Sequence, residues 1–140
     1  IMNSIKVNDL KYGNYNESRV HPILEETFGD LINNNVKDKY AKIDFKNKEY
    51  AVEYKRRRIN FGQYPTLMFN MNKIVKGKEY IARGKRVFYI WECNDGMYYW
   101  ELGGEFTEGK GGTTRRGCNE IGDVAHIKNS EINKLSNLVL

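Results

Sequence analysis

The sequence has 140 residues, a length that suits one compact domain over residues 1–140, and 23 basic against 18 acidic residues give a net charge of +5. Cys93 and Cys118 stand alone and far apart, which excludes a disulfide framework and a paired-cysteine metal site. No apolar run has the length of a membrane span or of a signal-peptide core, so we expect a soluble, cytoplasmic protein without a membrane partner.

The first predicted element is an amphipathic helix over residues 17–32. Pro22 and Gly29 reduce its regularity, and we expect the polar residues 33–35 to end it. Its apolar residues recur with the spacing of one helix face, and they are Val20, Ile23, Leu24, Phe28, Leu31 and Ile32.

A β-hairpin is predicted next, because residues 40–45 and 50–55 are two β-rich runs separated by residues 46–49, which suit a four-residue turn. Pro65 then opens a second helical pattern directly after the hairpin, and Gly77 stands where a helix commonly stops.

The last third of the chain is expected to add mostly strands. Residues 86–93 and 97–102 are rich in aromatic side chains and flank an Asn-Asp-Gly turn, which predicts a second hairpin. Residues 103–122 read as a long glycine-rich basic loop, 124–127 as a short strand, and 130–137 as a helical turn with Ser130 as its N-cap. The order of helices and strands predicts an α/β (α+β) fold with a central sheet covered by helices.

One strand of the first hairpin carries a candidate active site. Side chains alternate along a strand, so Glu53 and Lys55 share one face, and Asp44 on the partner strand comes within reach of the same ion as Glu53. Such carboxylates suit Mg²⁺ or Mn²⁺, with the Tyr54 carbonyl as a candidate further ligand. Lys55 could orient or deprotonate an attacking water, which phosphodiester hydrolysis requires.

The triplet acid-x-Lys is not specific by itself, because it also starts at Asp9, Asp44 and Glu108. The copy at Glu53 is distinguished by the apolar β run before it, by a partner strand that carries an acid, and by the basic stretch after it. The alternative from these residues alone is an ordinary surface hairpin with a cross-strand charge pair.

A resemblance strengthens the nuclease interpretation. The sequence I-D-F at 43–45 with V-E-Y-K-R at 52–56 resembles the D…ExK signature of the PD-(D/E)xK nuclease superfamily, although Ile43 replaces the usual proline. Residues 13–17 resemble the start of small Holliday-junction resolvases, and residues 64–73 are similar to a stretch in small nuclease-like proteins of large DNA viruses and phages. The resemblance implies a restriction-endonuclease-like core, a mixed sheet flanked by helices in αβββαβ order. The complete Q-x-x-x-Y motif of the exonuclease branch does not follow. The branch of the superfamily, and with it the substrate, therefore stays open.

The resemblance also implies a first acid from the leading helix, for which Glu17, Glu25 and Glu26 are candidates. Glu17 lies on the apolar stripe with Val20 and Leu24, whereas Glu25 and Glu26 are rotated from Leu24 by about 100° and about 200°. We therefore expect Glu17 to point toward the sheet and to join the catalytic set. The alternative role for Glu17 is a first-turn acid stabilised by the helix dipole.

Basic residues are expected to contact nucleic-acid phosphates, with solvated surface charge as the alternative for each group. The predicted contact residues are Arg56, Arg57, Arg58, Lys73, Lys110, Arg115 and Arg116.

These observations predict a metal-dependent DNA endonuclease, with branched or structured DNA as one candidate substrate. The first alternative is a non-catalytic nucleic-acid-binding protein on the same scaffold, and the second is an interaction module with incidental hairpin charges. The oligomeric state stays open, with a homodimer among the alternatives. If the protein is viral, it would act inside the infected host cell.

Overall fold

The computed structural model describes residues 4–36, 43–112 and 121–140. Two α-helices, nine strands and three short 3-10 turns lie within these ranges. In chain order they are α1 (Ser4–Phe28), β1 (Ile32–Asn33), η1 (Asn34–Val36), β2 (Phe45–Lys46), β3 (Tyr50–Arg56), β4 (Thr66–Asn70), α2 (Met71–Ala82), β5 (Arg86–Cys93), β6 (Gly96–Glu101), β7 (Thr107–Gly111), β8 (Gly122–Lys128), η2 (Asn129–Glu131), β9 (Asn133–Lys134) and η3 (Leu135–Asn137).

The strands of these ranges form a six-stranded sheet in the order β1-β2-β3-β5-β6-β9 and a three-stranded sheet in the order β4-β8-β7. In the larger sheet β3 and β5 are parallel, and the other pairs are antiparallel. The predicted mixed sheet flanked by helices is therefore confirmed, as is the predicted hairpin of β5 and β6.

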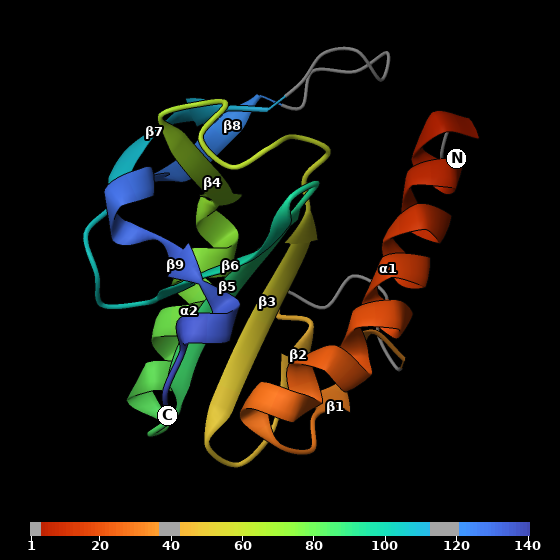
Figure 1. The fold of residues 1–140 in the computed structure, drawn as a ribbon, viewed down its shortest axis with the longest axis vertical. Coiled ribbons are helices and arrows are strands. Elements are labelled where there is room, and N and C mark those ends of the chain that lie inside the picture. The colour runs from red at the N-terminus through yellow and green to blue at the C-terminus, as the bar shows by residue number, and fades with distance from the viewer. Residues whose placement is uncertain (1–3, 37–42, 113–120) are drawn as a thin grey trace.

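The two helices cover opposite faces of the larger sheet, with α1 along β3 on one side and α2 on the other (Figure 1). The side chains of β5 alternate between two apolar clusters, one under each helix. Phe88 and Ile90 belong to the cluster under α1. Val87, Tyr89 and Trp91 belong to the cluster under α2. All five side chains are fully buried, as expected for a central strand covered on both faces.

Helix α1 is longer than predicted at its start and shorter at its end. It continues through Pro22 and ends at Phe28, because Gly29 adopts a left-handed conformation with φ of +80° and its N–H bonds the Glu25 carbonyl at 3.0 Å. The predicted apolar stripe is confirmed in Val20 and Leu24, which are fully buried.

The predicted start of the second helix at Pro65 is wrong. Residues 66–70 form β4, in which Leu67 and Phe69 are buried, and the helix begins only at Met71. Strand β4 pairs with β8, far away in the sequence. A local pattern cannot reveal this partner, and pairing with a distant strand overrides a local preference for helix.

Gly77 does not end the second helix, as the sequence suggested. It is buried in the middle of α2, and the chain turns instead at Gly84, where φ is +89°. A Cβ atom at position 77 would meet the Tyr89 hydroxyl and would lie 2.8 Å from Leu102 Cδ2. Glycine is needed here for close packing of α2 against the sheet.

Two further expectations need correction. Residues 107–111 of the predicted glycine-rich loop form β7, which pairs with β8, and residues 113–120 lie outside the described ranges. Ser130 is not the N-cap of a helical turn, because residues 129–137 consist of η2, β9 and η3. Residues 40–42 of the predicted first strand also lie outside the described ranges.

Neither helix in the described ranges is long and apolar enough to span a membrane.

The packing of α2 predicts the effect of Gly77→Ala. Helix propensity alone would favour alanine by about 1 kcal/mol, but displacing the Tyr89 hydroxyl and Leu102 should lower the free energy of unfolding by about 1–3 kcal/mol. Urea denaturation measures the change. Lys78→Ala, at the exposed neighbouring position, is the control and should stay within about 0.5 kcal/mol of wild type. A Gly77→Ala protein more stable than wild type would contradict the packing account.

Candidate active site

Asp44 and Glu53 face each other where β2 joins the sheet. The register pairs Phe45 with Val52, so the preceding residue Asp44 stands opposite Glu53. Both side chains are buried, and the Asp44 N–H donates to Glu53 Oε1 at 3.2 Å. The Tyr54 N–H donates to Asp44 Oδ2 at 2.9 Å. The predicted meeting of these two carboxylates is thus observed.

Glu17 joins the pair from α1 through an amide bridge. Asn35 Nδ2 donates to Glu17 Oε1 at 3.0 Å and to Asp44 Oδ1 at 2.7 Å. Sequence reasoning treated Asn35 only as part of a helix end, because a lone amide carries no chemical signature. The structure therefore places Glu17 in the cluster, as predicted, and adds Asn35. Glu25 is engaged elsewhere, where Oε2 accepts the Leu31 N–H at 2.9 Å.

Lys73 contacts the cluster, a position that the sequence did not predict, and its contact with a phosphate stays a prediction. It stands in the first turn of α2, and its Nζ lies 3.1 Å from Glu53 Oε2. The sequence missed this position because a helix counted from Pro65 puts Lys73 more than two turns from the helix start. The first turn of α2 instead comes close to β3.

Lys55 and Tyr54 occupy the positions expected from strand alternation. Lys55 follows Glu53 by two residues on β3, so it shares the Glu53 face, and it is exposed. Tyr54 turns its ring to the opposite face, where its hydroxyl donates to Glu92 Oε1 at 2.6 Å. The N–H and carbonyl of one strand residue point the same way, so the Tyr54 carbonyl faces the side of Asp44.

Burial, followed by neighbouring negative charge, raises the pKa values of two carboxyl groups in the site. Burial, followed by the hydrogen bond and charge of Asp44, raises the pKa of Glu17 from 4.5 to about 8. Burial and then the charge of Asp44 raise the pKa of Glu53 well above its usual range, and the Lys73 ammonium opposes this shift. The cluster therefore favours protons or other cations near neutral pH.

The donor chemistry fits a hard divalent cation. Asp44 and Glu53 present carboxylate oxygens to one place, and Mg²⁺ commonly uses one or two carboxylates while it keeps several waters. The buried Asn35 Oδ1 has no hydrogen-bond partner, so a polar acceptor beside the carboxylates is unsatisfied. Within the described ranges, no group of three or more His, Cys, Asp and Glu side chains is arranged to hold a metal. The site therefore suits a divalent cation through two carboxylates, those of Asp44 and Glu53.

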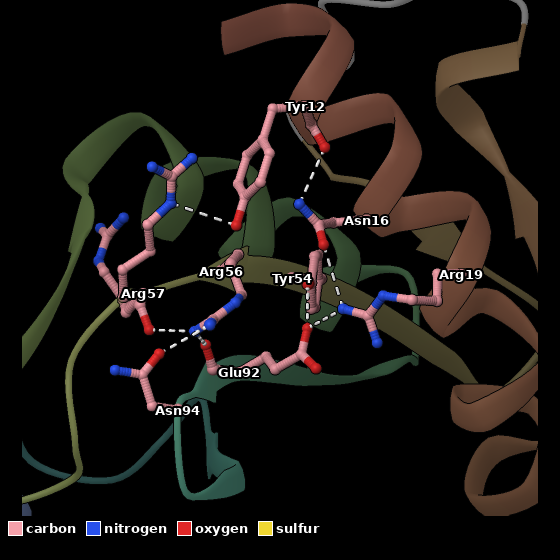
Figure 2. Close-up of polar contacts among 9 residues, drawn as sticks. Tyr12, Asn16, Arg19, Tyr54, Arg56, Arg57, Glu92 and Asn94 are labelled. Atoms are coloured by element: carbon pink, nitrogen blue, oxygen red, sulfur yellow. Dashed lines mark hydrogen bonds and ion pairs between the residues drawn. The ribbon is translucent and has the colours of Figure 1, made fainter.

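The three consecutive arginines that begin at the last residue of β3 have different surroundings. The Arg56 guanidinium bonds the carbonyls of Arg57 and Glu92, the latter at 3.0 Å, and Asn94 Oδ1 at 2.7 Å (Figure 2). An Arg57 nitrogen lies 3.4 Å from the Met68 carbonyl oxygen. Arg56 therefore ties the end of β3 to the β5–β6 turn, and its contact with a phosphate stays a prediction.

Arg58 is exposed and stacks on a tyrosine of α1. Its guanidinium carbon lies 4.1 Å from the centre of the Tyr12 ring, and its Nε donates to the Tyr12 hydroxyl at 3.2 Å. This hydrogen bond lowers the pKa of Tyr12. Arg58 therefore keeps an exposed guanidinium in a fixed place five residues beyond Glu53.

A partly buried ion pair between Arg19 and Glu92 ties α1 to the sheet. Figure 2 shows Arg19 and Tyr54 both directed at Glu92, whose pKa their hydrogen bonds lower against the opposing effect of burial. Asn16 accepts a hydrogen bond from Arg19 at 3.1 Å and donates to the Tyr12 carbonyl at 2.9 Å. These contacts hold the stretch of α1 that carries Glu17.

The fold and the acidic cluster define a PD-(D/E)xK type of protein, in which an acid just before one strand faces an acid-x-lysine sequence on the next. A family model described as "phage putative PDDEXK endonuclease" matches residues 30–135, and the chain belongs to this family. The match includes Asp44, Glu53 and Lys55, and it begins after Glu17. Neither the curated proteins nor the solved structures gave a match.

The raised pKa of Glu17 predicts how metal-free stability depends on pH. Its pKa of about 8 in the folded protein exceeds the ordinary 4.5, so the folded state holds a proton that the unfolded state has lost between these values. The stability that this proton contributes is fully present below pH 4.5 and is lost as the pH rises through about 8. The thermal midpoint in EDTA should therefore fall over this window, and Glu17→Gln should flatten the fall.

Glu26→Gln is the matched control for this experiment, because Glu26 is an exposed acid on the same helix. It should leave the slope of the thermal midpoint against pH unchanged. A Glu17→Gln protein that loses stability in parallel with wild type would show that Glu17 is not the titrating group.

Proposed function

We propose that this protein is a DNA endonuclease that hydrolyses phosphodiester bonds with Mg²⁺ or Mn²⁺. The observation that carries the proposal is the buried pair of Asp44 and Glu53, which stand opposite each other with the Glu17 carboxylate bridged to Asp44. Membership in a family of PDDEXK endonucleases supports nuclease chemistry on this site.

The residues of the cluster divide the chemistry among them. Asp44 and Glu53 would hold the metal, with the Tyr54 carbonyl as a further ligand. When bound, a divalent cation neutralises charge on the phosphate and acidifies a coordinated water. Lys55, on the Glu53 face of β3, orients the attacking water or takes its proton. Glu17 acts through Asn35, which holds the Asp44 carboxylate in place.

The basic residues differ in how well the structure supports a contact with DNA phosphates. Arg58 is exposed and fixed on Tyr12, so it suits a phosphate contact close to the cluster. Lys110 is exposed on β7, and its ammonium lies 2.6 Å from Asp123 Oδ1, a surface ion pair that a phosphate could replace. Arg115 and Arg116 remain predicted contacts that lie outside the described ranges.

The proposal extends to the setting of the reaction. A branched or structured DNA is the substrate form that the resemblance of residues 13–17 to junction resolvases supports. We further propose action in the cytoplasm of an infected host cell, supported by the phage family, with a homodimer as the arrangement that would cut paired strands. A non-catalytic binding protein on the same scaffold is the competing function.

Cleavage by purified protein tests the nuclease proposal. With Mg²⁺ or Mn²⁺, wild type should cut at least one of plasmid, linear duplex, single-stranded and four-way-junction DNA. Lys55→Ala should slow cleavage by roughly 100-fold or more and leave Ca²⁺ and DNA binding intact, because its ammonium is not a ligand. Glu53→Ala and Asp44→Asn should lose both cleavage and most Ca²⁺ affinity, measured by calorimetry.

Lys78→Ala, on the exposed side of α2, is the control and should cut at the wild-type rate. Wild type that cuts none of the four DNA forms would favour the non-catalytic binding protein. Lys55→Ala that cuts like wild type would remove Lys55 from the mechanism, and Ca²⁺ affinity unchanged by Asp44→Asn would place the ion elsewhere.

Arg58 and Arg56 give a second, separable test. Arg58→Gln should weaken DNA binding alike for all sequences and reduce the slope of log affinity against log salt by about 1, as expected for one lost phosphate contact. Arg56→Gln should instead lower the thermal midpoint, because Arg56 bonds main-chain and side-chain oxygens within the fold. Fluorescence anisotropy over a salt series measures the slope. An unchanged slope in Arg58→Gln would return Arg58 to ordinary surface charge.

A further inference from the structure

Lys73 occupies a position that the roles assigned above do not explain. Its Nζ lies 3.1 Å from Glu53 Oε2, the oxygen of Glu53 that does not bond the Asp44 N–H. The Lys73 side chain is 22% exposed, whereas that of Glu53 is 5% exposed. One end of the ion pair is therefore buried in the candidate metal site, and the other end is within reach of solvent and of a bound phosphate.

The backbone that carries Lys73 is held in place, whereas its side chain is long and flexible. The Tyr89 hydroxyl donates to the Lys73 carbonyl at 2.8 Å, and the next residue, Ile74, is fully buried. An ammonium on four methylene groups can change partner by rotation of the side chain alone. Exchange of the Glu53 contact therefore requires no movement of α2.

An ammonium and a divalent cation compete for this carboxylate. A metal held by Asp44 and Glu53 would bring two positive charges close to the Lys73 ammonium, and like charges repel strongly in a partly buried site. A DNA phosphate beside the metal offers the displaced ammonium a new anionic partner. Binding of the phosphate thus favours the state in which Glu53 is available to the metal.

We propose that Lys73 is an internal counter-ion of Glu53 that is exchanged for the divalent metal when a DNA phosphate binds, so that metal and DNA bind cooperatively. This inference rests on the proposed nuclease function and concerns the regulation of the same site. Lys73 is a positioning residue in this scheme, because it acts through Glu53 in the free protein. The scheme explains why a lysine pairs with a carboxylate that the metal requires.

The test measures Ca²⁺ affinity by calorimetry with and without the DNA form that wild type cleaves. In wild type, DNA should raise Ca²⁺ affinity by about 10-fold, and Ca²⁺ should raise DNA affinity by the same factor. Lys73→Met, which keeps the length without the charge, should bind Ca²⁺ roughly 10-fold more tightly than wild type in the absence of DNA, and DNA should then add little.

Lys76→Met is the matched control, because Lys76 lies three residues further along α2 and pairs with Glu79 at 3.0 Å, outside the cluster. It should keep the wild-type Ca²⁺ affinity and the wild-type coupling. Lys73→Arg, which retains a positive charge, should also keep the low affinity without DNA. This variant distinguishes loss of charge from general damage to the site.

The outcomes separate this inference from the proposed function. Wild type that cleaves DNA but shows no coupling between Ca²⁺ and DNA overturns the exchange, whatever the variants do. Weaker or unchanged Ca²⁺ binding in a folded Lys73→Met protein overturns it too, because Lys73 would then support Glu53 without competing. Wild type that cuts no DNA and binds no Ca²⁺ overturns the nuclease proposal and the exchange together.

Discussion

The register of β2 against β3 is the constraint on which the site depends. Phe45 and Val52 pair across these strands and are fully buried under α1, which fixes Asp44 opposite Glu53 on the neighbouring positions. A slip by one residue would turn Glu53 toward the apolar face under α1. The turn supports this register, because Asn47 Oδ1 accepts the Tyr50 N–H at 2.7 Å. Apolar packing therefore determines where the carboxylates meet.

Burial of carboxylates opposes folding, and the two apolar layers offset it. Strand β5 carries large side chains to both layers, with Phe88 under α1 and Trp91 under α2, and both are fully buried. The raised pKa of Glu17 and of Glu53 reflects unfavourable ionisation in this setting. Such perturbed groups are common at functional sites, because a ligand that supplies positive charge relieves them. The same feature that weakens the metal-free fold thus prepares the site for a cation.

The sequence predicted those parts of the site that follow from local periodicity. Alternation along β3 placed Glu53 and Lys55 on one face, and the stripe of α1 selected Glu17. The ion pair of Lys73 with Glu53 and the bridge made by Asn35 were not predicted, because they depend on contacts between distant segments. Arginines adjacent in sequence also read as one basic cluster, although the structure uses Arg56 internally and exposes Arg58. Local patterns do not encode which of several neighbouring cations finds an internal acceptor.

The small sheet determines where α2 meets the site. Strand β4 ends at Asn70 and α2 begins at Met71, so the pairing of Asn70 with Val124 on β8 sets the position of the first helical turn. That turn carries Lys73, whose backbone is also fixed by the Tyr89 hydroxyl. The pairing of β4 with β8 thus helps to determine where the first turn of α2 meets the carboxylates. No loop separates β4 from α2. A movement of the small sheet would therefore be transmitted directly to Lys73, whose ammonium faces Glu53.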